Sequence, residues 1–145
     1  MSKTHSPIIG FDGANRFLSN FFPCRVEYEG ITYRNTEAAF QAAKVLDDAT
    51  RKRFANLQPY DAKKLGRQVK LRPDWESVKV GVMRDVLRAK FSKPDLREKL
   101  LATGTGLLEE RNNHGDKIWG TTAPGVGQNL LGKLLMEIRE EIQTF

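Results

Sequence analysis

The fold is decided by one stretch of the chain, Asn35-Thr36-Glu37-Ala38-Ala39-Phe40-Gln41-Ala42-Ala43-Lys44-Val45-Leu46. At about 100° per residue, a helix through this stretch brings Glu37, Gln41 and Lys44 into one narrow arc, and every other position from 38 to 46 is apolar. A helix that is apolar on nearly every side is expected to be buried. Its carboxylate, amide and ammonium then either form one solvent-facing stripe, paired with one another and with water, or line a pocket.

The length and composition of the chain indicate one globular domain. Its 145 residues are enough to bury a core, and 39% hydrophobic with 29% charged residues is ordinary for a folded protein. We expect residues 1–7 to form a disordered leader. Residues 8–145 are expected to form a single α+β domain that is mostly helical, with a small antiparallel sheet.

Turn residues and hydrophobic periodicity divide the chain into short elements. The segment 26–33, centred on Glu29-Gly30, predicts a β-hairpin. Helices are expected over 47–57 and 59–67, from Asp74-Trp75 to about residue 90, and from Pro94 to about residue 102. Short strands are expected at 8–11, 107–111 and 117–120. The last helix is expected to present a core face of Leu130, Leu131, Leu134, Leu135, Ile138 and Ile142.

Charge and residue counts narrow the classes of function. The formal net charge of +6 suggests an anionic partner, and phosphate-bearing metabolites and nucleic acid both fit. No apolar run is long enough to span a bilayer, and the N-terminus has no apolar signal core. The single cysteine, Cys24, excludes an internal disulfide, and with two distant histidines it gives no metal-ligand spacing. We therefore expect a cytoplasmic protein with no metal, no cofactor and no membrane partner.

Two carboxylates and two tryptophans stand out by their context. Glu37 lies in the first turn of the predicted buried helix, where free N–H groups and the helix dipole favour its ionised form. Asp116 lies in a turn three residues before Trp119. Trp75 and Trp119 either present flat faces to a base or pack in the core. The N–H groups of Gly125, Gly127 and Asn129, at the start of the last helix, either hold a phosphate or belong to an ordinary flexible loop.

Four sequence blocks carry a family resemblance. They are Phe17-Leu18-Ser19-Asn20-Phe21-Phe22-Pro23; Thr36-Glu37 with Gln41 and Lys44; Asp116-x-x-Trp119-Gly120; and Gly127-x-Asn129-x-Leu131-Gly132 with Leu135-Met136-x-x-Arg139. In this order, and over residues 11 to 142, they resemble the NADAR family of YbiA-like N-glycosidases. The chain departs from the family at Ala38, where His is frequent, at Phe22, where Tyr is frequent, and over 121–123.

The resemblance implies hydrolysis of the bond between a ribose C1 and an exocyclic amine. One implied substrate class is the phosphorylated ribosylamino-pyrimidine intermediates of riboflavin biosynthesis. The other is ADP-ribose attached to the amino group of guanine, in DNA or RNA. Both carry phosphate, which agrees with the net positive charge. The departures at Ala38 and Phe22 bear on which substrate is used.

The resemblance also implies roles for individual residues. Glu37 is expected to act as a base or to stabilise an oxocarbenium-like state, as carboxylates do in glycosidases. Asp116 is expected to orient the ribose or to pass a proton to the leaving nitrogen. Lys44 either neutralises Glu37 or attacks the ring-opened sugar to form a Schiff base. The expected substrate-binding residues are Arg16, Ser19, Asn20, Phe21, Gln41, Trp75, Trp119, Gly120, Gly127 and Asn129.

Two other classes of function fit parts of the sequence. One is a module that binds ADP-ribose or nucleotides without hydrolysis, although the complete set of Glu37, Lys44 and Asp116 argues against it. The other is a basic nucleic-acid-binding protein, whose affinity for unmodified DNA would fall steeply with salt. The sequence leaves the oligomeric state open.

Overall fold

The computed structural model describes residues 6–143, which fall into two compact units. One unit is Asn20–Ser92, here called the α1 unit, and the other combines the described parts of Met1–Ser19 and Lys93–Phe145, here called the α6 unit. Of the predicted leader, residues 1–5 lie outside the described residues, and Ser6 and Pro7 are exposed without regular structure. The prediction of one domain over 8–145 stays a prediction.

The α1 unit begins with the predicted β-hairpin. Strands β2 (Val26–Tyr28) and β3 (Ile31–Tyr33) pair antiparallel, with Val26 opposite Tyr33. Glu29 (φ 48°) and Gly30 (φ 87°) occupy the turn, and two successive left-handed residues match the twist of a tight hairpin. The hairpin prediction is confirmed.

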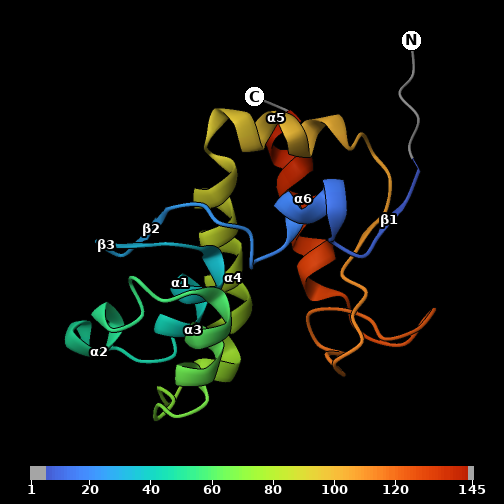
Figure 1. The fold of residues 1–145 in the computed structure, drawn as a ribbon. Coiled ribbons are helices and arrows are strands. Elements are labelled where there is room, and N and C mark those ends of the chain that lie inside the picture. The colour runs from blue at the N-terminus through green and yellow to red at the C-terminus, as the bar shows by residue number, and fades with distance from the viewer. Residues whose placement is uncertain (1–5, 144–145) are drawn as a thin grey trace. The chain divides into compact units, whose positions relative to one another are not determined.

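Helix α1 (Thr36–Ala42) lies at the centre of this unit and packs against β2, β3, α2, α3 and α4 (Figure 1). Asn35 caps it, because the Asn35 Oδ1 atom accepts the Ala38 N–H at 2.8 Å. All seven residues of α1 are buried, as the sequence predicts. The predicted end at residue 46 is wrong: α1 ends at Ala42, and Lys44 lies in the turn that follows.

Three further helices complete the α1 unit. Helix α2 (Asp48–Lys52) ends five residues before the predicted Leu57. Helix α3 (Pro59–Gly66) and the long helix α4 (Trp75–Phe91) lie close to their predicted bounds. The fully buried side chains of this unit include Val26, Tyr33, Phe54, Met83, Leu87, Lys90 and Phe91.

The α6 unit combines two helices with a short parallel strand pair. Its elements are β1 (Ile8–Ile9), the 3₁₀ helix η1 (Gly13–Leu18), α5 (Pro94–Ala102), β4 (Leu108–Glu109) and α6 (Leu130–Gln143). Strands β1 and β4 pair in parallel, with Ile8 opposite Leu108. The predicted strand at 117–120 is wrong: this segment is an irregular loop. The predicted mostly helical α+β class with a small antiparallel sheet is confirmed.

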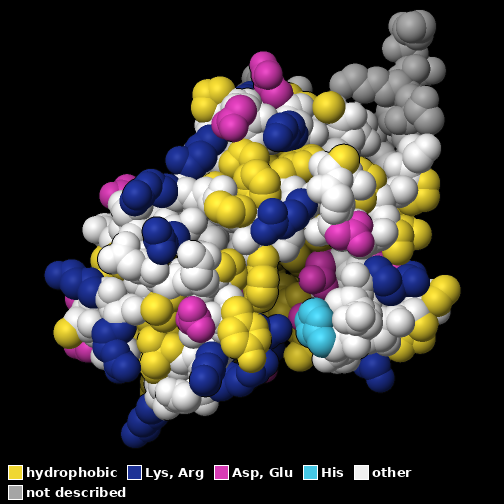
Figure 2. Space-filling model, in the orientation of Figure 1, with side chains coloured by type: hydrophobic (Ala, Val, Ile, Leu, Met, Phe, Trp, Pro, Cys, Tyr) yellow, Lys and Arg dark blue, Asp and Glu magenta, His cyan; other side chains and the backbone are white. Residues whose placement is uncertain are grey.

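The basic side chains are spread over the surface that Figure 2 displays. Figure 2 shows Lys and Arg side chains in separate places on the visible face rather than in one dense patch. No described helix is long and apolar enough to cross a membrane. Within residues 6–143, no three His, Cys, Asp or Glu side chains are placed to hold a metal ion.

Candidate active site

Glu37 is a buried carboxylate in the first turn of α1. Its residue is 8% exposed, and its Oε2 atom accepts a hydrogen bond from Gln41 Nε2 at 2.6 Å. The four-residue spacing puts both side chains on one helix face, one turn apart. Gln41 is also buried, so the solvent-facing alternative for the stripe is wrong at both positions.

Lys44 follows α1 and is held by the main chain on both sides. Its N–H donates to the Gln41 carbonyl at 3.1 Å, and its carbonyl accepts the Arg72 N–H at 2.8 Å. Lys44 is half-buried, and this burial lowers the pKa of its ammonium below the usual lysine value. The Glu37 carboxylate opposes that shift, whereas the charges of Arg67 and Lys63 add to it.

The lowered pKa favours a nucleophilic role for the Lys44 amine. A lysine that is partly desolvated and lies near other cations has a larger neutral fraction near neutral pH, and the neutral amine is the nucleophile. The Glu37 carboxylate acts in the opposite direction and raises the pKa of the ammonium. The two roles left open for Lys44, neutralising Glu37 and forming a Schiff base, both stay predictions; the charge of Glu37 acts on the Lys44 ammonium, and burial lowers its pKa.

Asn20 uses its polar groups inside the α1 unit. Its carbonyl accepts the Glu37 N–H at 3.2 Å, and its Oδ1 atom accepts the Thr36 hydroxyl at 3.1 Å. Its Nδ2 atom donates to the sulfur of Met83, a residue of helix α4, at 3.4 Å. The side chain is 7% exposed. These bonds favour a role for Asn20 in fixing the start of α1 over the predicted direct contact with substrate.

Trp75 packs in the core of the α1 unit. It is 5% exposed, and its ring centroid lies 5.1 Å from that of Phe40, at an interplanar angle of 56°. This is ordinary tilted aromatic packing. The structure thus favours the core alternative for Trp75 over a stacking platform for a base.

Asp116 organises the loop that carries Trp119. Its Oδ1 atom accepts the N–H groups of Ile118 at 3.0 Å and of Trp119 at 2.9 Å, which is an Asx-type turn. Asn112 braces the same turn, because its Oδ1 accepts the Asp116 N–H and its Nδ2 donates to the Asp116 carbonyl. Asp116 and Trp119 are therefore brought together, as their spacing predicts, with one carboxylate oxygen engaged by the main chain.

The start of α6 is already hydrogen-bonded. The N–H groups of residues 128–131 donate to the carbonyls of residues 117–120, at 2.7 to 3.2 Å. The Asn129 side chain is also engaged, since its Oδ1 accepts the Glu110 N–H and its Nδ2 donates to the Leu108 carbonyl. With these donors committed, the geometry disfavours a phosphate contact through the Asn129 N–H, whereas the predicted roles of Gly125 and Gly127 stay predictions.

Two glycines permit this close packing. A Cβ at Gly120 would overlap the carbonyl and Oε2 atoms of Glu110, and one at Gly127, which has a φ of 127°, would overlap the Gly120 carbonyl. Their structural role is thus to let three backbone segments meet. The remaining predicted binders keep their surface access: Arg16 on η1 is exposed, Ser19 is half-buried at the end of η1, and Phe21 is 38% exposed.

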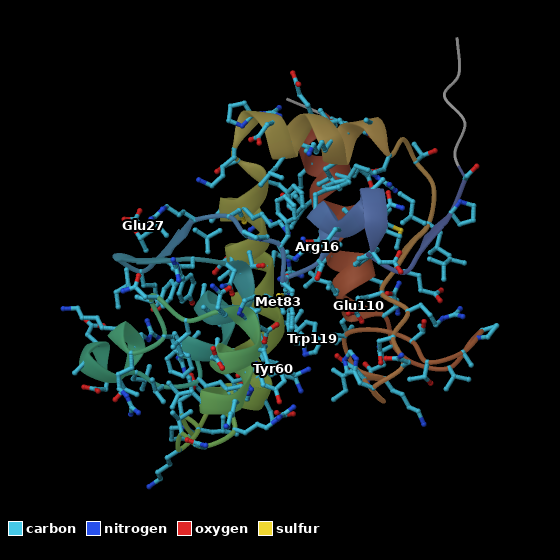
Figure 3. The ribbon with its side chains drawn as sticks, in the orientation of Figure 1. Arg16, Glu27, Tyr60, Met83, Glu110 and Trp119 are labelled. Atoms are coloured by element: carbon cyan, nitrogen blue, oxygen red, sulfur yellow. The ribbon has the colours of Figure 1, made fainter. Side chains whose placement is uncertain are left out.

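Two carboxylates of the α6 unit, Glu109 and Glu110, are not among the site residues predicted from the sequence. Glu110 follows β4, and its Oε2 atom accepts Asn112 Nδ2 at 3.2 Å; Figure 3 labels both Glu110 and Trp119. Neighbouring Glu109 binds the Thr121 hydroxyl and Arg111, and these bonds lower the pKa of its carboxyl. Both residues lie inside the strand predicted over 107–111, and nothing in the sequence distinguished them as site residues.

The structure therefore defines a small α+β protein with a buried carboxylate, an amide and a lysine of lowered pKa around one helix. Residues 10–143 match the family described as the NADAR domain. The chain is 42% identical over 129 residues to N-glycosidase YbiA of Escherichia coli (strain K12), covering 86% of this chain and 80% of that protein.

A second relative and a solved structure point to the same family. The chain is 36% identical over 136 residues to riboflavin biosynthesis protein VVA0006 of Vibrio vulnificus (strain YJ016), covering 91% of this chain and 37% of that protein. The NMR structure of the E. coli protein YbiA matches with a TM-score of 0.84 and 38% identity, over 99% of this chain and 88% of that chain. This chain belongs to the NADAR domain family, as its four sequence blocks predict.

Proposed function

We propose that this protein is a hydrolase that cleaves the N-glycosyl bond between ribose C1 and an exocyclic amine in a phosphorylated, nucleotide-like substrate. The names of its relatives support the reaction class, since the E. coli protein is an N-glycosidase. The observation that carries the proposal is the buried Glu37, bonded to Gln41 and electrostatically coupled to Lys44. The positive charges of Lys44, Lys63 and Arg67 suit a substrate that carries phosphate.

The proposed reaction starts from the ring-opened glycosylamine. Opening breaks the bond between C1 and the ring oxygen, which takes up a proton, and leaves a C1–nitrogen iminium. The neutral Lys44 amine adds to C1, and Glu37 accepts the proton that this addition releases. The leaving nitrogen receives a proton, for which Asp116 is the proposed donor, and departs as a free amine.

Water completes the cycle. It adds to C1 of the Lys44 Schiff base and expels the lysine amine, so that the sugar leaves as an aldehyde and recloses to ribose. One water is consumed, and the products are the free amine and the ribose moiety. Lys44 is suited to this route because burial lowers the pKa of its ammonium and so raises the fraction of neutral amine.

Two substrate classes remain candidates. The riboflavin intermediates are favoured by the name of the V. vulnificus relative. ADP-ribosylated guanine has the same glycosylamine linkage and phosphate, so the residues proposed above are equally suited to it. The same proposed chemistry serves both substrate classes, and a direct comparison of turnover separates them.

The test is a side-by-side turnover assay with the pure protein. It offers the phosphorylated ribosylamino-pyrimidines and ADP-ribosylated guanine, the latter as a mononucleotide and within DNA, and measures release of the free amine. Turnover of at least one class is expected. Binding without release of any amine would instead support a non-catalytic nucleotide-binding module, and binding of unmodified DNA alone, weakening steeply with salt, would support a nucleic-acid-binding protein.

A further inference from the structure

We propose that Gly66, at the end of helix α3, is a positioning residue for Glu37. Because Gly66 has no side chain, it leaves room for the one conformation of Gln41 that holds the Glu37 carboxylate. The expected effect of Gly66 on turnover rests on the function proposed above. Its expected effect on the conformation of Gln41 does not, so an experiment can reject the proposed function and the positioning role independently.

The backbone conformation of residue 66 does not require glycine. Gly66 lies within the helical range of α3, and its φ is outside the left-handed region that favours glycine. Alanine is the better helix former at such a position, so the missing side chain needs another reason. Packing supplies it: a Cβ at Gly66 would overlap the Gln41 Oε1 atom and would lie 2.8 Å from Gln41 Cδ.

The Gln41 amide has one orientation that fits Glu37. Its Nε2 donates to Glu37 Oε2 at 2.6 Å, and the reversed amide would set two oxygens against each other at that distance. Its Oε1 atom then points toward Gly66, where it is buried and accepts no hydrogen bond from any described residue. The Gln41 amide is thus held by its hydrogen bond to Glu37, and its oxygen occupies the space that the absence of a side chain at Gly66 leaves.

A methyl group at position 66 must therefore displace Gln41. Gln41 is 4% exposed, so it has little room to move while keeping its bond to Glu37. Once that bond is lost, the Glu37 carboxylate loses a donor that holds its orientation. Groups that act in the transition state must be held closely, so the loss is expected in kcat more than in KM.

The experiment compares Gly66→Ala with Gly81→Ala. Gly81 lies in helix α4, and a Cβ there meets no atom within 4 Å, so it is a matched control for adding a methyl to a helix. The first measurement is the Gln41 side-chain amide signal in a ¹H–¹⁵N NMR spectrum, assigned by its absence in Gln41→Ala. Gly66→Ala is expected to move this signal toward that of free glutamine, and Gly81→Ala is expected to leave it in place. An unmoved signal in Gly66→Ala overturns the proposal.

The second measurement is turnover. Gly66→Ala is expected to lower kcat about tenfold with KM changed less than about twofold, and to add nothing further in a Gln41→Ala background, because both changes remove one interaction. Equal kcat for Gly66→Ala and Gly81→Ala contradicts the positioning role while leaving the proposed function intact. If the wild type turns over neither substrate class, the proposed function fails and the NMR result alone decides the role of Gly66.

A folding control keeps the test decisive. If Gly66→Ala does not fold, the double variant Gly66→Ala/Gln41→Ala removes the atoms that the new methyl would overlap. Recovery of the melting temperature in the double variant supports the predicted contact. Failure to recover it shows that Gly66 serves other packing, and overturns the proposal.

Discussion

Helix α1 and the loop between β4 and α6 both carry polar family motifs, yet their polar groups serve different ends. On α1, the buried side chains of Glu37 and Gln41 bond to each other. In the loop, the side chains of Asn129 and Asp116 bond to main-chain groups. The loop side chains thus support the backbone, whereas the two α1 side chains bond each other. This difference is the reason for proposing that the chemistry lies at α1 and that most of the loop serves the architecture.

The first prediction that sharpens this contrast concerns Lys44, where a large effect is expected. Lys44→Arg keeps the positive charge but cannot form a Schiff base, so kcat is expected to fall about 1000-fold. In the wild type, borohydride with substrate is expected to trap an adduct on Lys44, detected by mass spectrometry. Because burial lowers the pKa of Lys44, kcat/KM is expected to rise with pH over a range below the usual lysine value. A fully active Lys44→Arg variant with no trapped adduct would leave Lys44 only as a countercharge.

The second prediction concerns another buried lysine of the α1 unit, Lys90. Lys90 on α4 is fully buried beside the rings of Phe22 and Phe91, and burial lowers its pKa to about 8. The folded state thus binds this proton more weakly than the unfolded chain. The resulting penalty is fully present below about pH 8 and is relieved as pH rises toward 10.5.

Comparison with Lys90→Met isolates that penalty. Between pH 7 and pH 10.5, the unfolding free energy of the wild type is expected to rise by up to about 3 kcal/mol relative to the variant. Urea titrations of both proteins at several pH values measure this. A difference that stays constant with pH would show that Lys90 has an ordinary pKa in the folded protein.

The third prediction distinguishes two roles of Asp116, the hydrogen-bond acceptor in the turn and the proposed proton donor. Asn at this position can still accept the Ile118 and Trp119 N–H groups but cannot carry a proton to the leaving nitrogen. Asp116→Asn is therefore expected to lower kcat about 100-fold with little change in melting temperature. Asp116→Ala is the matched variant that also removes the turn acceptor and is expected to melt earlier. Wild-type turnover in Asp116→Asn would reduce Asp116 to a part of the turn.

The smallest expected effect is one of stability at Asn129. Asn129→Ala leaves the Glu110 N–H and the Leu108 carbonyl without their side-chain partner, and also places Ala at a φ of 53°. We expect a loss of about 2 kcal/mol in unfolding free energy, with the KM for phosphorylated substrate nearly unchanged. A large rise in KM without a loss of stability would restore the phosphate-binding role that the sequence predicts for this residue.

The sequence predicts features that depend on local periodicity and turn chemistry. The buried face of α1, the hairpin at Glu29-Gly30 and most of the core face of α6 follow from the spacing of apolar residues and the choice of turn residues. On α6 the predicted face is wrong at its two ends, where Leu130 and Ile142 are only half-buried. The end of α1 at Ala42 could not be predicted from these local patterns, because Ala43 itself favours a helix. The main chain turns there, and the Lys44 carbonyl accepts the N–H of Arg72, 28 positions along the chain.

The sequence could not show which polar motif residues are already satisfied. Nothing near Asn129 in the sequence indicates that its amide bonds to Leu108 and Glu110, some 20 residues earlier. The role of Gly66 is hidden for the same reason, since it depends on the packing of α3 against α1. Such partners are set by tertiary contacts, which a single sequence does not display.

The most direct test of the central claim is the turnover of Glu37→Gln, measured with its melting temperature on whichever substrate the wild type cleaves. The substituted side chain keeps an amide oxygen that can accept from Gln41 Nε2, so the fold should be retained while the charge and the proton acceptor are lost. We predict that turnover falls at least about 1000-fold with the melting temperature nearly unchanged. Turnover close to that of the wild type in a folded Glu37→Gln variant would contradict the assignment of the chemistry to helix α1.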